Sequence, residues 1–119
     1  MIIFRFRPFA SVSAALTSLA LASCHAPTLE ESYSGPWSVP TGEVAVSLAR
    51  NGAKNCGEFY QKESSTTKGE FAVACNASKS DSGPPIWVVY LVWPRIDKAV
   101  GPDYAAITRV GGPPPRDLK

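Results

Sequence analysis

The chain has 119 residues, of which 45% are hydrophobic, 18% charged and 10% aromatic, and this composition excludes a polytopic membrane protein, a coiled coil and a wholly disordered polymer. Twelve Lys and Arg residues stand against ten Asp and Glu residues, but Arg5 and Arg7 lie in a leader that we expect to be removed. Ten cations then face ten anions, so the charge surplus typical of nucleic-acid binding is missing and we expect no nucleic-acid partner.

Residues 1–23 have the pattern of a secretory signal peptide. Arg5 and Arg7 provide a short cationic start, and residues 9–22 form an apolar stretch without any charge. This stretch is shorter than the roughly 20 residues that a helix needs to cross a bilayer. We therefore expect residues 1–23 to direct export and then to be cut off.

The junction Leu21-Ala22-Ser23-Cys24 resembles the lipobox of bacterial lipoprotein precursors, in which an apolar residue and two small residues precede a cysteine. The resemblance implies that the Cys24 thiol receives a diacylglycerol, that the chain is cut just before Cys24, and that the new amine is acylated, for example with palmitate. A cysteine suits this reaction because its thiolate is a nucleophile. Two or three acyl chains hold a protein on a membrane far better than one, so the membrane is the first expected partner.

His25 follows Cys24 and is the only histidine in the chain. Lipoproteins that lack Asp at this place resemble those sorted to the outer membrane of Gram-negative bacteria. The resemblance thus implies a lipid-anchored protein on the periplasmic face of the outer membrane. The alternative is an ordinary secretory signal peptide with a free cysteine near its cleavage site, since Leu-Ala-Ser also suits a conventional signal peptidase.

Residues 24–40 are predicted to form a lipidated tether. The segment is rich in Ser, contains three prolines from residue 25 onward, and has no sustained helical or strand period. Tyr33 and Trp37 interrupt the polar sequence, and we expect them to pack on the domain rather than to enter the membrane interface. The folded domain is then expected to span residues 41–110.

The sequence TGEVAVSLARNGAKN predicts a helix over residues 42–51. Thr41 can cap its start, Val44 and Leu48 fall on one helical face, and Gly52 suits the left-handed position after its end. A strand is the alternative, because Val44, Val46 and Leu48 also alternate. The basic Arg50 near the end favours the helix.

The runs CGEFYQKE and GEFAVAC flank a Ser/Thr-rich loop and predict an antiparallel hairpin. Cys56 and Cys75 are the cysteines left once Cys24 is acylated, and an oxidising compartment favours a disulfide between them. If these two cysteines face each other directly, Tyr60 lies opposite Phe71. A redox-active pair is disfavoured because the close C-x-x-C spacing is missing, and no metal site is expected because further ligands at suitable spacing are missing.

The run IWVVYLVW at residues 86–93 is apolar on both sides and predicts a central strand covered on both faces. Residues 104–110 are a weaker candidate for a fourth strand, and residues 111–119 predict a proline-rich tail in the polyproline II conformation. The expected fold class is therefore α+β, with one helix packed on a small antiparallel sheet of three or four strands.

A single helix covers only one face of such a sheet, so something else must shield the other. There are three alternatives for this cover: the tether, the segment after Pro94, or another molecule. We favour cover from within the chain. An aromatic surface that is partly open would receive a partner, an envelope protein or peptidoglycan. The candidate residues are Phe59, Trp87, Tyr90 and Trp93, of which Trp87 and Trp93 share one face of the strand and Tyr90 lies on the other.

No catalytic constellation is recognisable, and no cofactor is expected. The only histidine lies beside the proposed anchor, and the carboxylates form no recognisable pair. The sequence therefore predicts a non-catalytic envelope lipoprotein that binds a partner or supports an assembly. The alternative is a small lipoprotein inhibitor of an envelope-targeting enzyme such as lysozyme.

Overall fold

The computed structural model describes residues 26–54, 56–78, 83–116 and 118. The predicted signal peptide, the lipobox with Cys24, and His25 lie outside the described residues. None of the helices in the described ranges has the length and apolar character needed to cross a bilayer.

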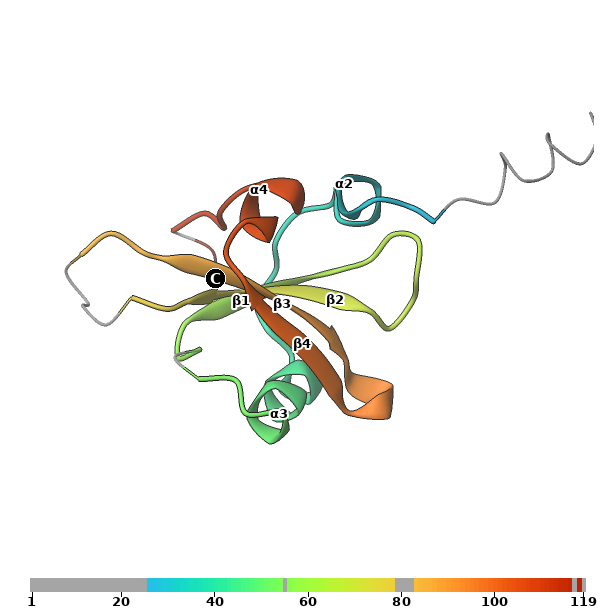
Figure 1. Ribbon diagram of the computed structural model, residues 1–119, viewed down its shortest axis with the longest axis horizontal. Coiled ribbons are helices and arrows are strands. Elements are labelled where there is room, and N and C mark those ends of the chain that lie inside the picture. The colour runs from blue at the N-terminus through green and yellow to red at the C-terminus, as the bar shows by residue number, and fades with distance from the viewer. Residues whose placement is uncertain (1–25, 55, 79–82, 117, 119) are drawn as a thin grey trace, which may run out of the picture.

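The domain is an antiparallel sheet with short helices on both of its faces (Figure 1). Four strands follow each other in the order β1-β2-β3-β4, so every strand pairs with its neighbour in the sequence. Their bounds are Phe59–Glu63 for β1, Phe71–Asn76 for β2, Trp87–Trp93 for β3 and Lys98–Asp103 for β4. The expected α+β class is confirmed, with more helical segments than the single helix predicted.

Helix α3, Gly42–Arg50, confirms the helix predicted over residues 42–51. It buries Val44 and Leu48 against the sheet, and Gly52 has a φ of +77° just after its end. The Thr41 side chain makes no capping hydrogen bond; the Thr41 backbone N–H instead donates to Gln61 Oε1 at 2.9 Å. The start of α3 is thus fixed by a side chain of β1.

The predicted register of the β1–β2 hairpin is wrong. Phe59 pairs with Cys75 and Glu63 pairs with Phe71, whereas the prediction set Tyr60 opposite Phe71. The shift is by an odd number of residues, so the side chains of β1 exchange faces. The physical reason is that Cys56 lies before the strand and reaches Cys75 from outside the ladder, while the loop closes through Ser64 N–H donating to the Glu70 carbonyl at 2.8 Å.

The core has two layers, one on each side of the sheet. The layer under α3 contains Val44, Leu48, Phe71, Val73, Cys75, Val88, Tyr90 and Val92. The opposite layer contains Tyr33, Trp37, Ala72, Ala74, Val89, Ala106 and Val110. Strand β3 pairs with both β2 and β4 and contributes to both layers, which confirms the prediction of a central strand covered twice.

Most of the predicted tether is part of the folded domain. Helix α2, Leu29–Ser32, begins with a capping box between Thr28 and Glu31. Tyr33 and Trp37 are buried in the second core layer, as expected for these two side chains, and Ser38 forms a bridge with Gln61 at the edge of β1. The Ser and Pro content predicted a tether, but composition does not report tertiary contacts. Tyr33 and Trp37 cover the sheet face that α3 leaves open, and the segment folds with them.

The predicted fourth strand is also placed differently. Strand β4 precedes residues 104–110, which contain the helix α4, Ala106–Arg109. A short 3-10 helix, η2 (Pro94–Ile96), and the left-handed Asp97 reverse the chain directly after β3, so the pairing begins already at Lys98. The predicted tail also packs on the domain at its start, because the Gly112 carbonyl accepts a hydrogen bond from Trp37 Nε1 at 3.0 Å and Pro114 is buried.

Candidate binding surface

The four predicted aromatic residues do not form one surface. Tyr90 is 8% exposed and belongs to the layer under α3, where Phe59 packs beside it. Trp87 packs against the opposite layer, and the alternation of β3 places Trp93 on the same face as Trp87. Each tryptophan is half-buried at one end of β3, because the segments with Tyr33 and α4 cover the middle of that face.

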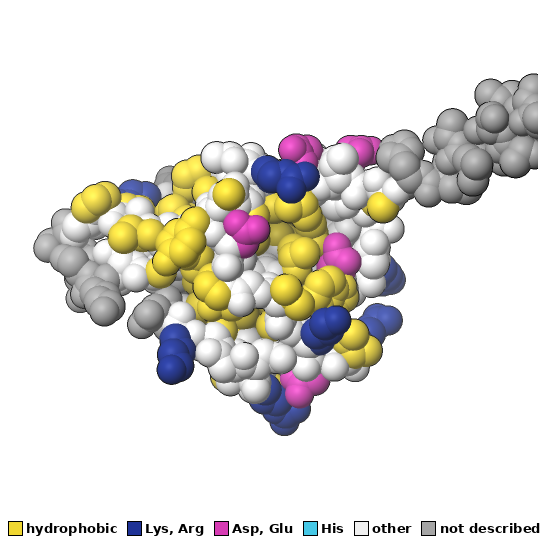
Figure 2. Space-filling view, in the orientation of Figure 1, with side chains coloured by type: hydrophobic (Ala, Val, Ile, Leu, Met, Phe, Trp, Pro, Cys, Tyr) yellow, Lys and Arg dark blue, Asp and Glu magenta, His cyan; other side chains and the backbone are white. Residues whose placement is uncertain are grey.

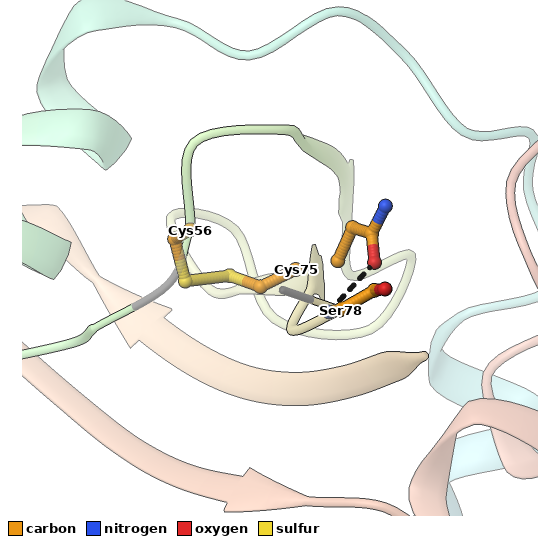
Figure 3. The surroundings of a disulfide bond; sticks show 4 residues. Cys56, Cys75 and Ser78 are labelled. Atoms are coloured by element: carbon orange, nitrogen blue, oxygen red, sulfur yellow. Dashed lines mark hydrogen bonds between the residues drawn. A yellow bond between two sulfur atoms is a disulfide. The ribbon is translucent and has the colours of Figure 1, made fainter. Parts of the chain in front are cut away.

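The predicted disulfide is present and lies at one end of the sheet. Cys56 and Cys75 are 19 residues apart in the chain, and their Cα atoms are 4.9 Å apart (Figure 3). Close by, Ser78 N–H donates to Asn76 Oδ1 at 3.0 Å, which orders the chain just after β2. The bond therefore ties the segment before β1 to the end of β2.

A small apolar hollow of about 170 Å³ lies between α3 and the disulfide. Its lining consists of Ala45, Leu48, Ala49, Ala53, Cys56 and Phe59. The lining side chains carry no charge and no polar group beyond the bonded sulfur.

Strand ends at the disulfide side of the sheet bring together a mixed aromatic and polar group around Trp87. The rings of Tyr60 and Trp87 are 6.1 Å apart and tilted by 56°. Glu58 accepts hydrogen bonds from Asn76 Nδ2 at 2.9 Å and from the Tyr60 hydroxyl at 3.4 Å. Burial, and then the nearby negative charge of Glu58, raise the pKa of Tyr60.

Ile86 is an exposed apolar residue next to Trp87 in the sequence, with 49% of its surface accessible. Its backbone N–H donates to Asn76 Oδ1 at 3.2 Å, so the same asparagine fixes Glu58 and the entrance to β3. We call the group of Glu58, Tyr60, Asn76 and Trp87 the Trp87 surface; Ile86 lies outside it, because the alternation along the strand turns its side chain to the opposite face. Sequence reasoning included Trp87 but missed the other members, because the wrong register placed Tyr60 on the other face.

At the opposite end of β3, Trp93 belongs to a hydrogen-bonded group around Glu70. The Glu70 carboxylate accepts from Trp93 Nε1 at 3.0 Å and from the Tyr33 hydroxyl at 2.5 Å. Burial, and then the interaction with Glu70, raise the pKa of Tyr33. Lys98 Nζ lies 5.6 Å from the centre of the Trp93 ring, within the range of a cation–π contact.

Lys62 is a buried cation that sequence reasoning missed. Its ammonium donates to the Val110 carbonyl at 2.7 Å and to the Tyr33 carbonyl at 3.4 Å, and it lies 4.4 Å from the centre of the Trp37 ring. The side chain is 4% exposed, and burial lowers the pKa of Lys62. Lys62 thus joins segments from both ends of the described chain to β1. No sequence signal distinguishes it from an exposed strand lysine.

Comparison with known proteins gives no relative for this chain. No protein-family model, no curated protein and no solved structure matches it. Within the described ranges, His, Cys, Asp and Glu side chains form no group of three or more that could hold a metal ion.

Proposed function

We propose that the protein is a lipid-anchored lipoprotein of the bacterial envelope, held on the periplasmic face of the outer membrane by acyl chains on Cys24. The observation that carries this proposal is the sequence Leu21-Ala22-Ser23-Cys24 at the end of an export signal. The disulfide between Cys56 and Cys75 supports it, because structural disulfides persist in exported compartments and are rare in the reducing cytosol.

We further propose that the domain is a non-catalytic binding or assembly module and that the Trp87 surface receives its partner. Trp and Tyr are the residue types that contribute most to binding energy at protein interfaces, and here the rings of Tyr60 and Trp87 lie 6.1 Å apart. Glu58 and Asn76 supply polar atoms at the rim that are already fixed by hydrogen bonds. A preorganised surface of this kind loses little entropy on binding.

Anchoring is tested by the intact mass of the protein extracted from bacterial membranes. The expected product begins at Cys24 and carries the mass of a diacylglycerol and an added acyl chain. Cys24→Ser is expected to abolish the modification and to release the protein from the membrane fraction. Ser23→Ala is the matched control, because it keeps a small residue before the cysteine and leaves processing unchanged. An unmodified, water-soluble parent protein would overturn the proposal.

Partner binding is tested by cross-linking in intact cells from a photoreactive phenylalanine analogue at position 60, where it replaces the ring of Tyr60 in the Trp87 surface. The expected result is a cross-link to an envelope protein or to peptidoglycan that Trp87→Ala weakens about tenfold or more, a loss typical of a central interface tryptophan. Tyr104→Ala is the matched control, because Tyr104 is an aromatic residue that is 64% exposed outside the Trp87 surface.

Equal cross-linking by the parent and Trp87→Ala would contradict the role of the Trp87 surface. A lysozyme assay with the parent protein examines the inhibitor alternative, which predicts loss of lysozyme activity on addition of the protein.

A further inference from the structure

The path from the proposed anchor to the folded domain is short. Cys24 is four residues before Thr28, whose side chain caps α2. Four fully extended residues span at most about 14 Å. If Cys24 carries acyl chains, as proposed above, the start of α2 must therefore lie close to the membrane surface.

The β1–β2 loop and η2 form one end of the domain together with α2. Ser65 in the β1–β2 loop donates from its hydroxyl to the Glu31 carbonyl at 3.1 Å and from its backbone N–H to the Ser32 carbonyl at 2.8 Å. Further along the same loop, a β-carbon on Gly69 would lie 3.9 Å from Cδ of Arg95 in η2. In Figure 1, α2, the β1–β2 loop and η2 accordingly lie on the same side of the molecule, away from the C-terminal end.

This end carries cations and apolar groups that face solvent. Lys68, Arg95 and Lys98 are exposed, and within the described part of the chain none of them forms an ion pair. Ile96 is 68% exposed between them, beside the half-buried Trp93. We call these five residues the basic-apolar patch, and Figure 2 shows Lys and Arg atoms beside hydrophobic ones on this side of the molecule.

The carboxylates at this end are already engaged within the chain. Glu30 is 3.2 Å from Arg109, and Asp97 is 3.7 Å from Arg50. Glu63 accepts from the Gly69 N–H at 3.0 Å, and Glu70 accepts from Trp93 and Tyr33. Glu63 and Glu70 accept from neutral donors and keep their negative charge. Lys68, Arg95 and Lys98 nevertheless form no ion pair in the described part of the chain, so they remain available to an anionic partner.

We propose that the basic-apolar patch docks the domain on the bilayer surface through anionic phospholipid headgroups. Lys and Arg beside Trp and Ile are the combination found on surfaces that bind membrane interfaces, where cations meet phosphate and apolar groups enter the acyl boundary. Each basic residue near an anionic surface strengthens binding roughly fivefold. The short link to Cys24 keeps the patch at high effective concentration near the lipid, so a weak attraction is sufficient.

Hydrogen exchange of the full lipidated protein in vesicles tests this docking. On phosphatidylethanolamine vesicles that contain phosphatidylglycerol, residues 64–70 and 94–98 are expected to exchange at least about fivefold more slowly than on phosphatidylcholine vesicles. High salt is expected to remove the difference. Residues 52–54, and residues 86–88 at the other end of β3, serve as internal references and are expected to exchange at the same rate on both vesicles.

The double variant Lys68→Glu, Arg95→Glu is expected to lose the protection on anionic vesicles. Lys54→Glu, Arg116→Glu is the matched control, because it makes the same charge change at exposed positions outside the patch and is expected to retain it. Flotation of the parent with phosphatidylcholine vesicles separates docking from anchoring. A parent that floats but shows no lipid-dependent protection, or shows it at residues 86–88 instead, overturns the docking and leaves the anchor intact. A parent that does not float overturns the proposed anchor.

Discussion

The ammonium of Lys62 is held by backbone carbonyls and an aromatic ring in place of a carboxylate. Burying a cation is unfavourable unless its N–H donors are satisfied. Here the carbonyls of Tyr33 and Val110, far apart in the chain, both accept hydrogen bonds from the ammonium. Gly111 adjoins this site, where a β-carbon would come within 2.8 Å of Lys62 Nζ, and its φ of +102° also favours glycine. Lys62 and Gly111 therefore fit each other sterically.

Replacement of Lys62 is predicted to destabilise the domain by an amount that depends on the aliphatic stem. Lys62→Ala removes the stem and leaves the Val110 carbonyl unpaired, and we expect it to lower the free energy of unfolding by about 2–4 kcal/mol. Lys62→Met keeps most of the stem, and we expect a loss of about 1–2 kcal/mol. Urea unfolding measures both, and equal losses would show that the stem contributes nothing.

The lowered pKa of Lys62 predicts the direction of a pH effect in the same measurement. Between the folded pKa and the usual 10.5, the unfolded chain binds more protons than the folded one, so stability rises with pH through this window. Lys62→Met is expected to lack that rise. The raised pKa values of Tyr33 and Tyr60 act in the opposite direction above about pH 10, and they are common to both proteins, so the difference between the two proteins reports Lys62.

At the scale of elements, the hairpin shows how a disulfide can mislead a register prediction. Cys56 and Cys75 do pair, but Cys56 reaches its partner from a segment before β1. The ladder is fixed instead by the closure of its loop, where Ser64 Oγ accepts from the backbone N–H groups of Thr66 and Thr67. That local geometry places Gln61 where it can bind Thr41 and Lys62 where it can bind Val110.

Removal of the disulfide is predicted to cost about 3 kcal/mol of unfolding free energy, the loss expected for opening a loop of this size. The double variant Cys56→Ala, Cys75→Ala, compared with the parent by urea unfolding, measures the loss. Cys24→Ser is the control, because it removes a cysteine outside the disulfide and is expected to leave the unfolding free energy of the domain unchanged. A double variant as stable as the parent would contradict the prediction.

At the scale of the whole molecule, the two ends of the chain complete the fold. The N-terminal segment brings Tyr33 and Trp37, and the C-terminal segment brings Val110, to the sheet face that α3 leaves uncovered. Trp37 Nε1 also binds the Gly112 carbonyl, and Arg109 lies 3.2 Å from Glu30, so the two segments contact each other as well as the sheet. Because these segments cover the middle of the face, Trp87 and Trp93 are separated into surfaces at its two ends.

The two proposed functions therefore belong to different ends of the domain. The basic-apolar patch with Trp93 lies at the end beside α2, close to the proposed anchor, and the Trp87 surface lies at the other end of β3. A domain docked on the membrane through the first surface would present the second to the periplasm. The predicted sheet face around Trp87 and Trp93 is thereby divided into two surfaces with different neighbours.

The sequence by itself determined features that depend on local pattern: the helix over residues 42–51, the central strand near residues 86–93, and the Cys56–Cys75 pair. The export signal and its lipobox remain a prediction. Amphipathic period, apolar runs and cysteine count are read within short windows. Only the tertiary structure decided the hairpin register, the burial of Lys62, and the separation of Trp87 from Trp93. These features depend on contacts between segments far apart in the chain, where the free energy comes from covering a sheet face and satisfying buried polar groups rather than from the preference of any single segment.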